Sequence, residues 1–310
     1  MNYVNLFNLV KRFPSFYKLI FVFMIQKKSV LNNKDSVISE KKIGNDKALA
    51  NETSENSIIQ SIRFFFTEVS LITLFTIKFF KQVIFPPYEI KEFLKQCYIL
   101  GYKSLPLVSI TGFIMGLVLT IQARPTMAEF GAESWIPGMV AVSIIREIGP
   151  VITSLICAGK IGSSIGAELA SMKVTEQIDA MEVSGINPFK YLVVTRILAT
   201  TLMIPVLTIF SDFISLYGSY AGVNITGEIS IKLFFSQVFA SLDFIDVIPA
   251  LIKTFFFGFA IGLIGCYKGF NSDKGTEGVG ASANSAVVIG SLLIFIIDMI
   301  AVQITSLIST

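Results

Sequence analysis

Long apolar stretches, separated by short polar ones, fill most of the sequence after residue 104. Five of them are near or above the roughly 20 residues that a helix needs to cross a hydrocarbon core about 30 Å thick. These stretches predict spanning helices over residues 105–123, 135–160, 191–221, 247–267 and 285–308. We therefore expect an all-α polytopic membrane protein with five transmembrane helices.

The segment that precedes these spans, residues 62–85, is apolar but carries Arg63, Glu68, Lys78 and Lys81. A spanning helix with four charges would be costly, whereas a lysine near the membrane surface can extend its ammonium group to water. We therefore expect an N-terminal interfacial or re-entrant helix here and not a sixth span.

Residues 1–60 form an N-terminal extension to a membrane domain of residues 61–310. Residues 1–28 are basic with a short apolar core and no small-residue cleavage site, which fits a cytoplasmic or surface-lying segment better than a signal peptide. Residues 29–57 are polar and poor in aromatic residues, a composition typical of disorder.

Two sets of small residues indicate close packing between helices. Gly112 and Gly116 lie four apart in the first span, and their contact is either within one subunit or between subunits. A longer row with the same spacing follows the second span, and such a row lets two helix backbones approach closely. Its members are Ala158, Gly162, Gly166 and Ala170.

A short amphipathic helix is predicted after this row, over residues 174–183. Its apolar residues share one face and its acidic residues lie towards the other. Gly185 suits the left-handed position just past a helix end, and Pro188 prevents continuation. We expect this helix to lie outside the bilayer against a soluble partner.

Lysine and arginine residues are unevenly distributed between the polar segments. They are frequent before the first span, in residues 160–196 and in residues 268–284, whereas residues 124–134 and 222–246 hold one each. The positive-inside rule therefore places the N-terminus and the amphipathic helix in the cytoplasm. Five spans then leave the C-terminus on the outer side.

The composition agrees with a membrane protein and argues against several enzyme classes. Of the 310 residues, 53% are hydrophobic and only 15% are charged, and there is no histidine. Cys97, Cys157 and Cys266 are isolated, so we expect no metal site and no cofactor. No phosphate-binding loop or nucleophile elbow is present, so we expect no nucleotide hydrolysis or acyl transfer by this chain. The net charge of +3 is small, and no nucleic-acid partner is expected.

Four ionisable residues lie at membrane depth, namely Arg146, Glu147, Lys253 and Asp298. An unpaired buried charge would be expensive, so the two positive and two negative groups are expected to pair. Lys253 is a candidate partner for Glu147, and Asp298 for Arg146. The cluster either fixes how the helices pack or forms the polar lining of a cavity.

The string REIGPVITSLICAGKIGSSIGAELASMKVTEQIDAMEVSGINP, residues 146–188, closely resembles the signature of the MlaE (YrbE) family. This family comprises the permease subunits of ABC-type lipid transporters. The resemblance runs from about Pro87 to the C-terminus. It implies a non-catalytic permease that works as a homodimer, with a separate ATPase subunit and an MCE-domain lipid-binding protein. The implied substrate is phospholipid, moved between the inner membrane and the outer envelope.

The resemblance also assigns roles to residues. The amphipathic helix would be the cytoplasmic coupling helix, and the residues implied in ATPase coupling are Glu168, Lys173, Val174, Thr175, Glu176, Gln177, Asp179 and Met181. A lipid pathway in a dimer cavity would be lined near its outer end. Its implied residues are Leu119, Gln122, Thr126, Met127, Phe130 and Glu147.

Two other functional classes stay open at this point. A proton-coupled secondary transporter would use Glu147 and Asp298 as proton sites, and a structural scaffold would transport nothing. The expected location is the inner (cytoplasmic) membrane of a bacterium with two membranes, in preference to the inner envelope of a plastid.

Overall fold

The computed structural model describes residues 46–308 except 87, 226, 228 and 273–274. The chain divides into two compact units, residues 1–66 and 67–310. All regular structure in the described ranges is helical. The α-helices are α3 (Asp46–Ile84), α4 (Ile90–Leu100), α5 (Leu105–Glu129), α6 (Ile136–Ser143), α7 (Gly149–Cys157), α8 (Ser163–Val174), α9 (Gln177–Val183), α10 (Thr195–Asn224), α11 (Ile231–Ser241), α12 (Phe244–Phe270) and α13 (Thr276–Ile308).

The described part of the first unit is the beginning of α3. This helix starts at Asp46, so residues 46–57 are helical where the sequence predicted disorder. Half of these twelve residues are Ala, Glu, Leu or Lys, which are good helix formers. The rest of that prediction, and the basic segment before it, fall on residues 1–45 and lie outside the described residues.

The prediction of five spans is confirmed. Five helical runs in the described residues are long and apolar enough to cross a membrane. They are Ile90–Glu129, Glu133–Val174, Phe189–Asn224, Phe244–Phe270 and Thr276–Leu307. Most extend beyond the predicted limits, because the predictions end where polar residues begin, whereas helical hydrogen bonding continues past the hydrocarbon core.

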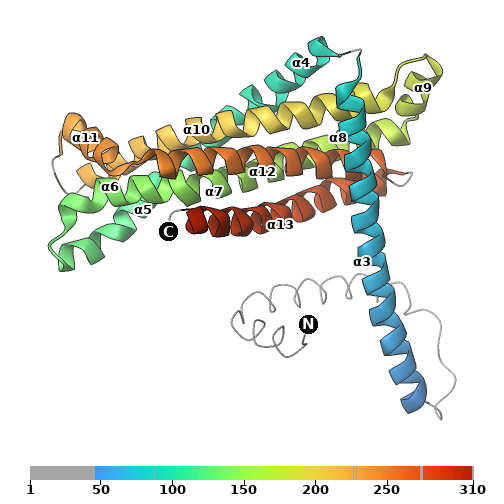
Figure 1. Ribbon diagram of the computed structural model, residues 1–310, viewed down its shortest axis with the longest axis horizontal. Coiled ribbons are helices and arrows are strands. Elements are labelled where there is room, and N and C mark those ends of the chain that lie inside the picture. The colour runs from blue at the N-terminus through green and yellow to red at the C-terminus, as the bar shows by residue number, and fades with distance from the viewer. Residues whose placement is uncertain (1–45, 87, 226, 228, 273–274, 309–310) are drawn as a thin grey trace. The chain divides into compact units, whose positions relative to one another are not determined.

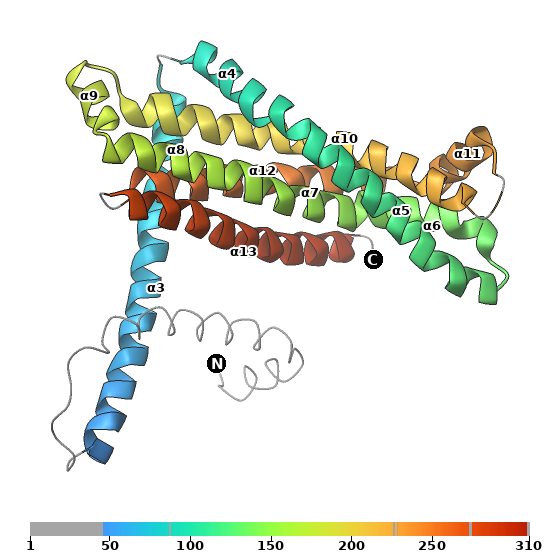
Figure 2. The same cartoon turned by 180° about the vertical axis from the view of Figure 1, so that it is seen from behind.

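Helix α10 occupies the centre of the second unit, where it packs against both α5 and α12. Figures 1 and 2 show these helices running alongside one another with α13. A side chain at Gly116 would collide with the Ser215 carbonyl of α10, and one at Gly218 would collide with the Phe113 carbonyl of α5. The Gly112–Gly116 face therefore packs within one subunit, against α10.

The small-residue row on α8 also makes contacts within the subunit. An added side chain at Gly166 would meet the Ser282 carbonyl of α13 at 3.2 Å. A side chain at Gly269 of α12 would in turn meet the Gly166 carbonyl at 2.8 Å. The row therefore lets α8, α12 and α13 pack with little space between their backbones.

Residues 67–84 of α3 lie across one end of these helices (Figure 1). Phe75 is buried with its ring centroid 5.0 Å from that of Phe189 and 5.5 Å from that of Tyr267. The opposite face is apolar and exposed, as at Leu74 and Ile77. A crosswise helix with one buried and one exposed apolar face fits the interfacial placement that the sequence favours.

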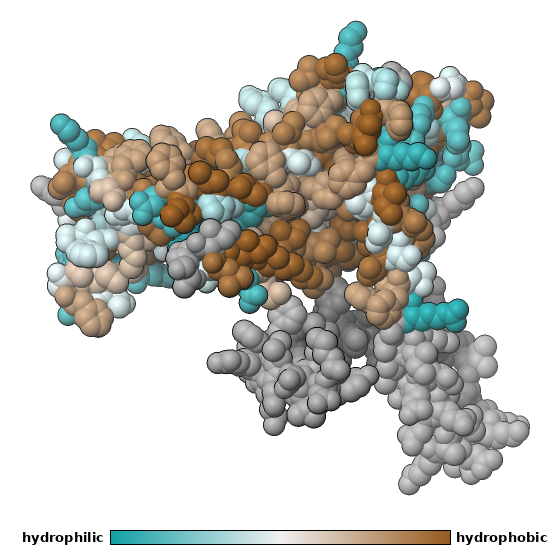
Figure 3. Space-filling view, in the orientation of Figure 1, coloured by the Kyte–Doolittle hydropathy of each residue, from teal (hydrophilic) through white to brown (hydrophobic). Residues whose placement is uncertain are grey.

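Apolar side chains cover most of the middle of the face in Figure 3, and polar side chains gather towards its two ends. Many large apolar side chains are exposed, among them Phe213, Phe256 and Phe295. This exposure would be a liability in water, but it is what a hydrocarbon environment requires.

Three π-helical turns interrupt the spans within the described residues, and the sequence analysis did not anticipate them. Two of them, η3 (Ile144–Ile148) and η4 (Ala158–Gly162), join α6 to α7 and α7 to α8. The third, η5 (Phe189–Val194), leads into α10. A π turn holds one residue more than an α turn and often marks a functional site.

Candidate functional site

Lys253 is the centre of a charge cluster inside the helical bundle. Its side chain is only 5% exposed, and its Nζ atom donates to Glu147 Oε2 at 2.6 Å and to Asp298 Oδ1 at 2.9 Å. The three residues come from α12, η3 and α13. The cluster therefore connects three elements that are distant in the sequence, and the expected pairing of Lys253 with Glu147 is confirmed.

The expected pairing of Arg146 with Asp298 is wrong. Arg146 Nη1 lies 3.6 Å from Asp246 Oδ1, in the first turn of α12. Asp246 also belongs to a capping box with Asp243, which fixes this carboxylate at the helix start. Arg146 and Glu147 line the same small pocket, but the guanidinium group pairs with Asp246 and the Glu147 carboxylate with Lys253.

The balance of charge explains why Lys253 tolerates its burial. An ammonium group without a nearby anion would be strongly unfavourable in the bundle interior, and two carboxylates compensate it. The Asp298 side chain is 19% exposed and the Glu147 side chain 38% exposed, so Asp298 is the more enclosed of the two partners.

The space beside the cluster is too small for a lipid. A pocket of about 10 Å³ lies there, lined by residues that include Glu147, Lys253 and Thr305. This volume is near the lower limit for one water molecule. Any passage of an acyl chain past Glu147 would therefore require the surrounding helices to separate.

Asp212 on α10 is a fourth acidic residue in this region, and the sequence analysis missed it. Its Oδ1 atom is buried and has no hydrogen-bond partner among the described residues. A side chain at Gly149 would collide with this carboxyl group unless the carboxyl group shifted, so the two residues are closely opposed. Lys253 is the charged group that acts electrostatically on Asp212. An acidic residue inside a predicted span was the available signal.

The remaining residues of the implied lipid pathway lie on the outer half of α5 or just beyond it, and none of them lines the pocket beside Glu147. Leu119 and Met127 pack against a buried apolar cluster that includes Ile136 and Val140. Gln122, Thr126 and Phe130 are exposed. The structure therefore does not bring this set together around one cavity within a single chain.

Glu168, one of the implied coupling residues, is engaged in an ion pair at the end of the bundle near α9. Its Oε1 atom accepts from Arg196 Nη2 at 2.9 Å, and Arg196 is almost completely buried. Arg196 Nη1 also donates to the Leu192 carbonyl at 3.0 Å. Glu168 thus neutralises a buried guanidinium and ties α8 to α10.

The predicted helix over residues 174–183 is shorter than expected. Helix α8 ends at Val174, and α9 begins at Gln177 after a tight turn. Glu176 adopts a left-handed conformation with φ of 59°, the sole non-glycine residue with positive φ in the described residues. This conformation redirects the chain and sets α9 apart from α8. Gly185 has φ of 79°, as the sequence predicted for the helix end.

Helix α9 has one buried and one exposed face. Ile178 is buried, and Met181 and Val174 are half-buried. The other implied coupling residues at the helix are at least partly exposed, and Lys173 Nζ lies 2.9 Å from Asp179 Oδ1 across the turn. The exposed set is Thr175, Glu176, Gln177 and Asp179. Such a face is available to a basic partner surface.

No group of three or more His, Cys, Asp or Glu side chains within the described ranges has a geometry that could hold a metal ion. The three cysteines are free thiols. The functional features of this chain are thus a charge cluster in the bundle and an exposed acidic helix at one end.

Comparison with known proteins identifies the family of the chain. The model of one family, Permease MlaE, matches residues 93–304. A probable ABC transporter permease protein of Rickettsia typhi is 39% identical over 232 residues, which cover 75% of this chain and 90% of the relative.

Two photosynthetic organisms contain further relatives. A probable ABC transporter permease protein of Synechocystis is 37% identical over 203 residues, covering 66% of this chain and 77% of the relative. The chloroplast protein TRIGALACTOSYLDIACYLGLYCEROL 1 of Arabidopsis thaliana is 36% identical over 200 residues, covering 64% of this chain and 57% of the relative.

Proposed function

The chain belongs to the MlaE family of ABC transporter permeases, and we propose that its cargo is phospholipid, moved between the inner membrane and the outer envelope. As a permease subunit it is an integral membrane protein that does not itself hydrolyse ATP. The observation that carries the proposed coupling to an ATPase is the exposed acidic face of α9, which lies next to polar segments rich in lysine and arginine.

A separate ATPase subunit is the proposed partner of α9. A permease without a nucleotide site needs a contact through which ATP hydrolysis can do work. Glu176 and Asp179 are exposed, and the left-handed turn at Glu176 separates α9 from the long helix before it. We propose that these two carboxylates meet basic residues of the ATPase, where complementary charge favours association.

Two features support a lipid as the cargo. The Arabidopsis relative carries the name of a glycolipid, trigalactosyldiacylglycerol. On the outer half of α5, Leu119 and Met127 provide apolar surface beside the exposed residues Thr126 and Phe130. We propose that a second copy of the chain completes a cavity at this surface, which a single chain does not enclose.

The remaining partners and the location follow from the same family membership. We propose a homodimer that binds two ATPase copies in the cytoplasm and an MCE-domain lipid-binding protein outside. The inner membrane of a bacterium with two membranes is the proposed location, and the chloroplast relative makes a plastid envelope the alternative. Glu147 and Asp298 both pair with Lys253, an arrangement that favours a structural or gating role over free proton carriage.

The test is purification of the tagged chain from its own membranes in a mild detergent, followed by identification of the proteins and lipids that accompany it. The double variant Glu176→Lys/Asp179→Lys should lose the ATPase or uncouple its hydrolysis from lipid transfer. Loss of the Lys173–Asp179 ion pair by itself should cost at most about 1 kcal/mol, because the pair is exposed.

A matched control places the same charge change at the other end of the bundle. The variant Glu129→Lys/Glu133→Lys alters two acidic residues near the end of α5 and should retain the ATPase. Full ATPase binding and full lipid transfer by the Glu176→Lys/Asp179→Lys variant would contradict the assignment of α9. Absence of phospholipid from the purified complex would contradict the assignment of the cargo.

A further inference from the structure

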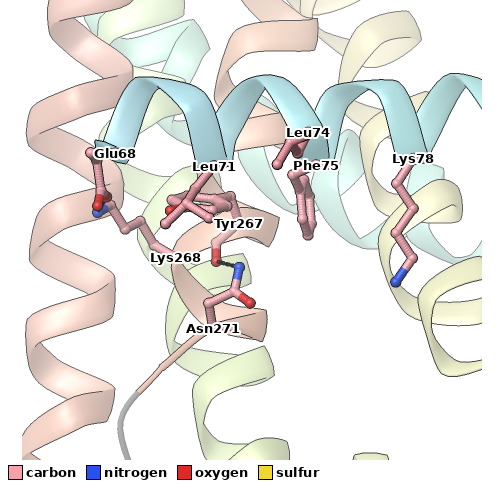
Figure 4. Close-up of a pocket in the computed structure, with 8 residues that line it drawn as sticks. All are labelled: Glu68, Leu71, Leu74, Phe75, Lys78, Tyr267, Lys268 and Asn271. Atoms are coloured by element: carbon pink, nitrogen blue, oxygen red, sulfur yellow. Dashed lines mark hydrogen bonds and ion pairs between the residues drawn. The ribbon is translucent and has the colours of Figure 1, made fainter. Parts of the chain in front are cut away.

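A pocket of about 480 Å³ lies between residues 67–84 of α3 and the C-terminal end of α12. Its apolar part is formed by Leu71, Leu74, Phe75 and Tyr267. Its polar part is formed by Glu68, Lys78, Lys268 and Asn271 (Figure 4). This volume is within the range of about 300–1,000 Å³ that is usual for small-molecule sites.

The charged groups of the pocket are not equivalent. Lys268 forms an ion pair with Glu68, so these two charges compensate each other. Figure 4 shows this pair at one end of the pocket and Lys78 at the other, with Phe75 between them. Lys78 Nζ lies 4.4 Å from the centroid of the Phe189 ring, and no carboxylate is within ion-pair distance of it among the described residues. The pocket therefore has a net charge of about +1, located at Lys78.

The apolar part of the pocket has the character of a membrane interface. Leu71 and Leu74 are about half exposed, although they belong to a helix that packs through Phe75 onto the aromatic residues of α12 and η5. Asn271 Nδ2 donates to the Tyr267 carbonyl at 3.0 Å, which holds the amide at the rim. A ligand that suits the pocket must join a single negative charge to aliphatic carbon.

We propose that this pocket binds an anionic phospholipid of the cytoplasmic leaflet, with its phosphate at Lys78 and its aliphatic part against Leu71 and Leu74. A phosphodiester with one negative charge matches the net charge of the pocket, and a cytoplasmic leaflet supplies such lipids at the level of an interfacial helix. The bound lipid would hold residues 67–84 of α3 against α12. The inference requires only that the chain is embedded in a membrane, and it holds whatever the transported cargo is.

The chain offers a direct test, because it contains a single tryptophan, Trp135. In a Trp135→Phe background, a reporter is introduced by Leu71→Trp or, separately, by Leu74→Trp. Both positions are about half exposed, and both lie at the pocket. The full-length protein is reconstituted into phosphatidylcholine bilayers that contain either dibrominated phosphatidylglycerol or dibrominated phosphatidylcholine, and quenching of the reporter is measured.

At both reporter positions, brominated phosphatidylglycerol should bind about fivefold more strongly than brominated phosphatidylcholine, the factor expected for one lysine near the headgroups. Lys78→Gln should reduce the ratio of phosphatidylglycerol binding to phosphatidylcholine binding to about one. Lys81→Gln is the matched control, because Lys81 is an exposed lysine on the same helix that does not line the pocket, and the preference should persist. Native Trp135, at the other end of the bundle, should show no preference.

Equal binding of the two brominated lipids at both reporters, in the protein that keeps Lys78, would overturn the proposal. It would mean that the reporters make ordinary contact with bulk lipid. Persistence of the preference in Lys78→Gln would also overturn it. Loss of the preference on addition of inorganic phosphate would mean that the pocket takes a soluble anion and not a lipid. Equal elution volumes and helical circular dichroism for all variants would show that a changed ratio does not arise from misfolding.

Discussion

Replacing Lys253 by methionine removes the cation that pairs with both Glu147 and Asp298. Removal of one partner from a buried ion pair costs about 3–5 kcal/mol, because the remaining charge stays buried and uncompensated. We therefore expect Lys253→Met to lower the free energy of unfolding by about 3 kcal/mol.

The two carboxylates should contribute less, and unequally. Glu147→Gln leaves Lys253 paired with Asp298 at 2.9 Å and keeps a neutral hydrogen-bond acceptor beside the ammonium group, so its cost should be about 1 kcal/mol. Asp298→Asn removes the more buried partner and should cost about 2 kcal/mol. The triple variant Glu147→Gln/Lys253→Met/Asp298→Asn has no unpaired charge in the cluster. It should recover at least half of the loss seen for Lys253→Met.

The free energy of unfolding can be followed by titrating the purified protein in mixed micelles with a denaturing detergent and recording circular dichroism. Lipid transfer should be measured on the same preparations. The reasoning is refuted if Glu147→Gln destabilises the protein as strongly as Lys253→Met, or if the triple variant is less stable than Lys253→Met. A Glu147→Gln variant that is nearly as stable as the parent but transfers lipid poorly would assign this carboxylate to the transport path.

Two further predictions concern the backbone. Glu176→Gly should raise the free energy of unfolding by about 1 kcal/mol, because glycine adopts the left-handed conformation without strain. A loss of stability in the same detergent titration would instead show that contacts within the subunit hold the Glu176 side chain. Gly218→Ala should lower the free energy of unfolding by about 1–3 kcal/mol, because the added methyl group would collide with the Phe113 carbonyl of α5. Gly290→Ala is the control, since no atom lies within 4 Å of the added carbon, and equal effects of the two changes would contradict close α5–α10 packing.

The existence of the spans could be predicted because hydrophobic length decides it. The five predicted stretches all correspond to helical runs, and Gly185 has the predicted left-handed conformation. Hydrophobic length fixes how deep a residue lies in the membrane, but it does not fix the direction in which the side chain points. The pairing of Arg146 was mispredicted for this reason, since its partner Asp246 lies in the first turn of α12.

Other features depend on contacts between distant segments. Asp212 is important because Gly149 leaves room for its carboxyl group, and sequence alone does not reveal that these residues are opposed. The ion pair of Glu168 with Arg196 likewise joins two spans. The turn at Glu176 was missed because glutamate is a good helix former, and a strained left-handed glutamate persists only where the surrounding structure holds it.

The π turns η3, η4 and η5 have a consequence for how this chain can change in length. Deleting a residue from a regular spanning helix turns every later side chain by about 100° relative to the earlier ones, which separates glycines from the carbonyls that they face. Each π turn already holds one residue beyond the α-helical number, so a deletion there leaves an ordinary α-helix. Segments Ile144–Ile148, Ala158–Gly162 and Phe189–Val194 are therefore the places where relatives of different length can lose a residue while their spans stay helical throughout.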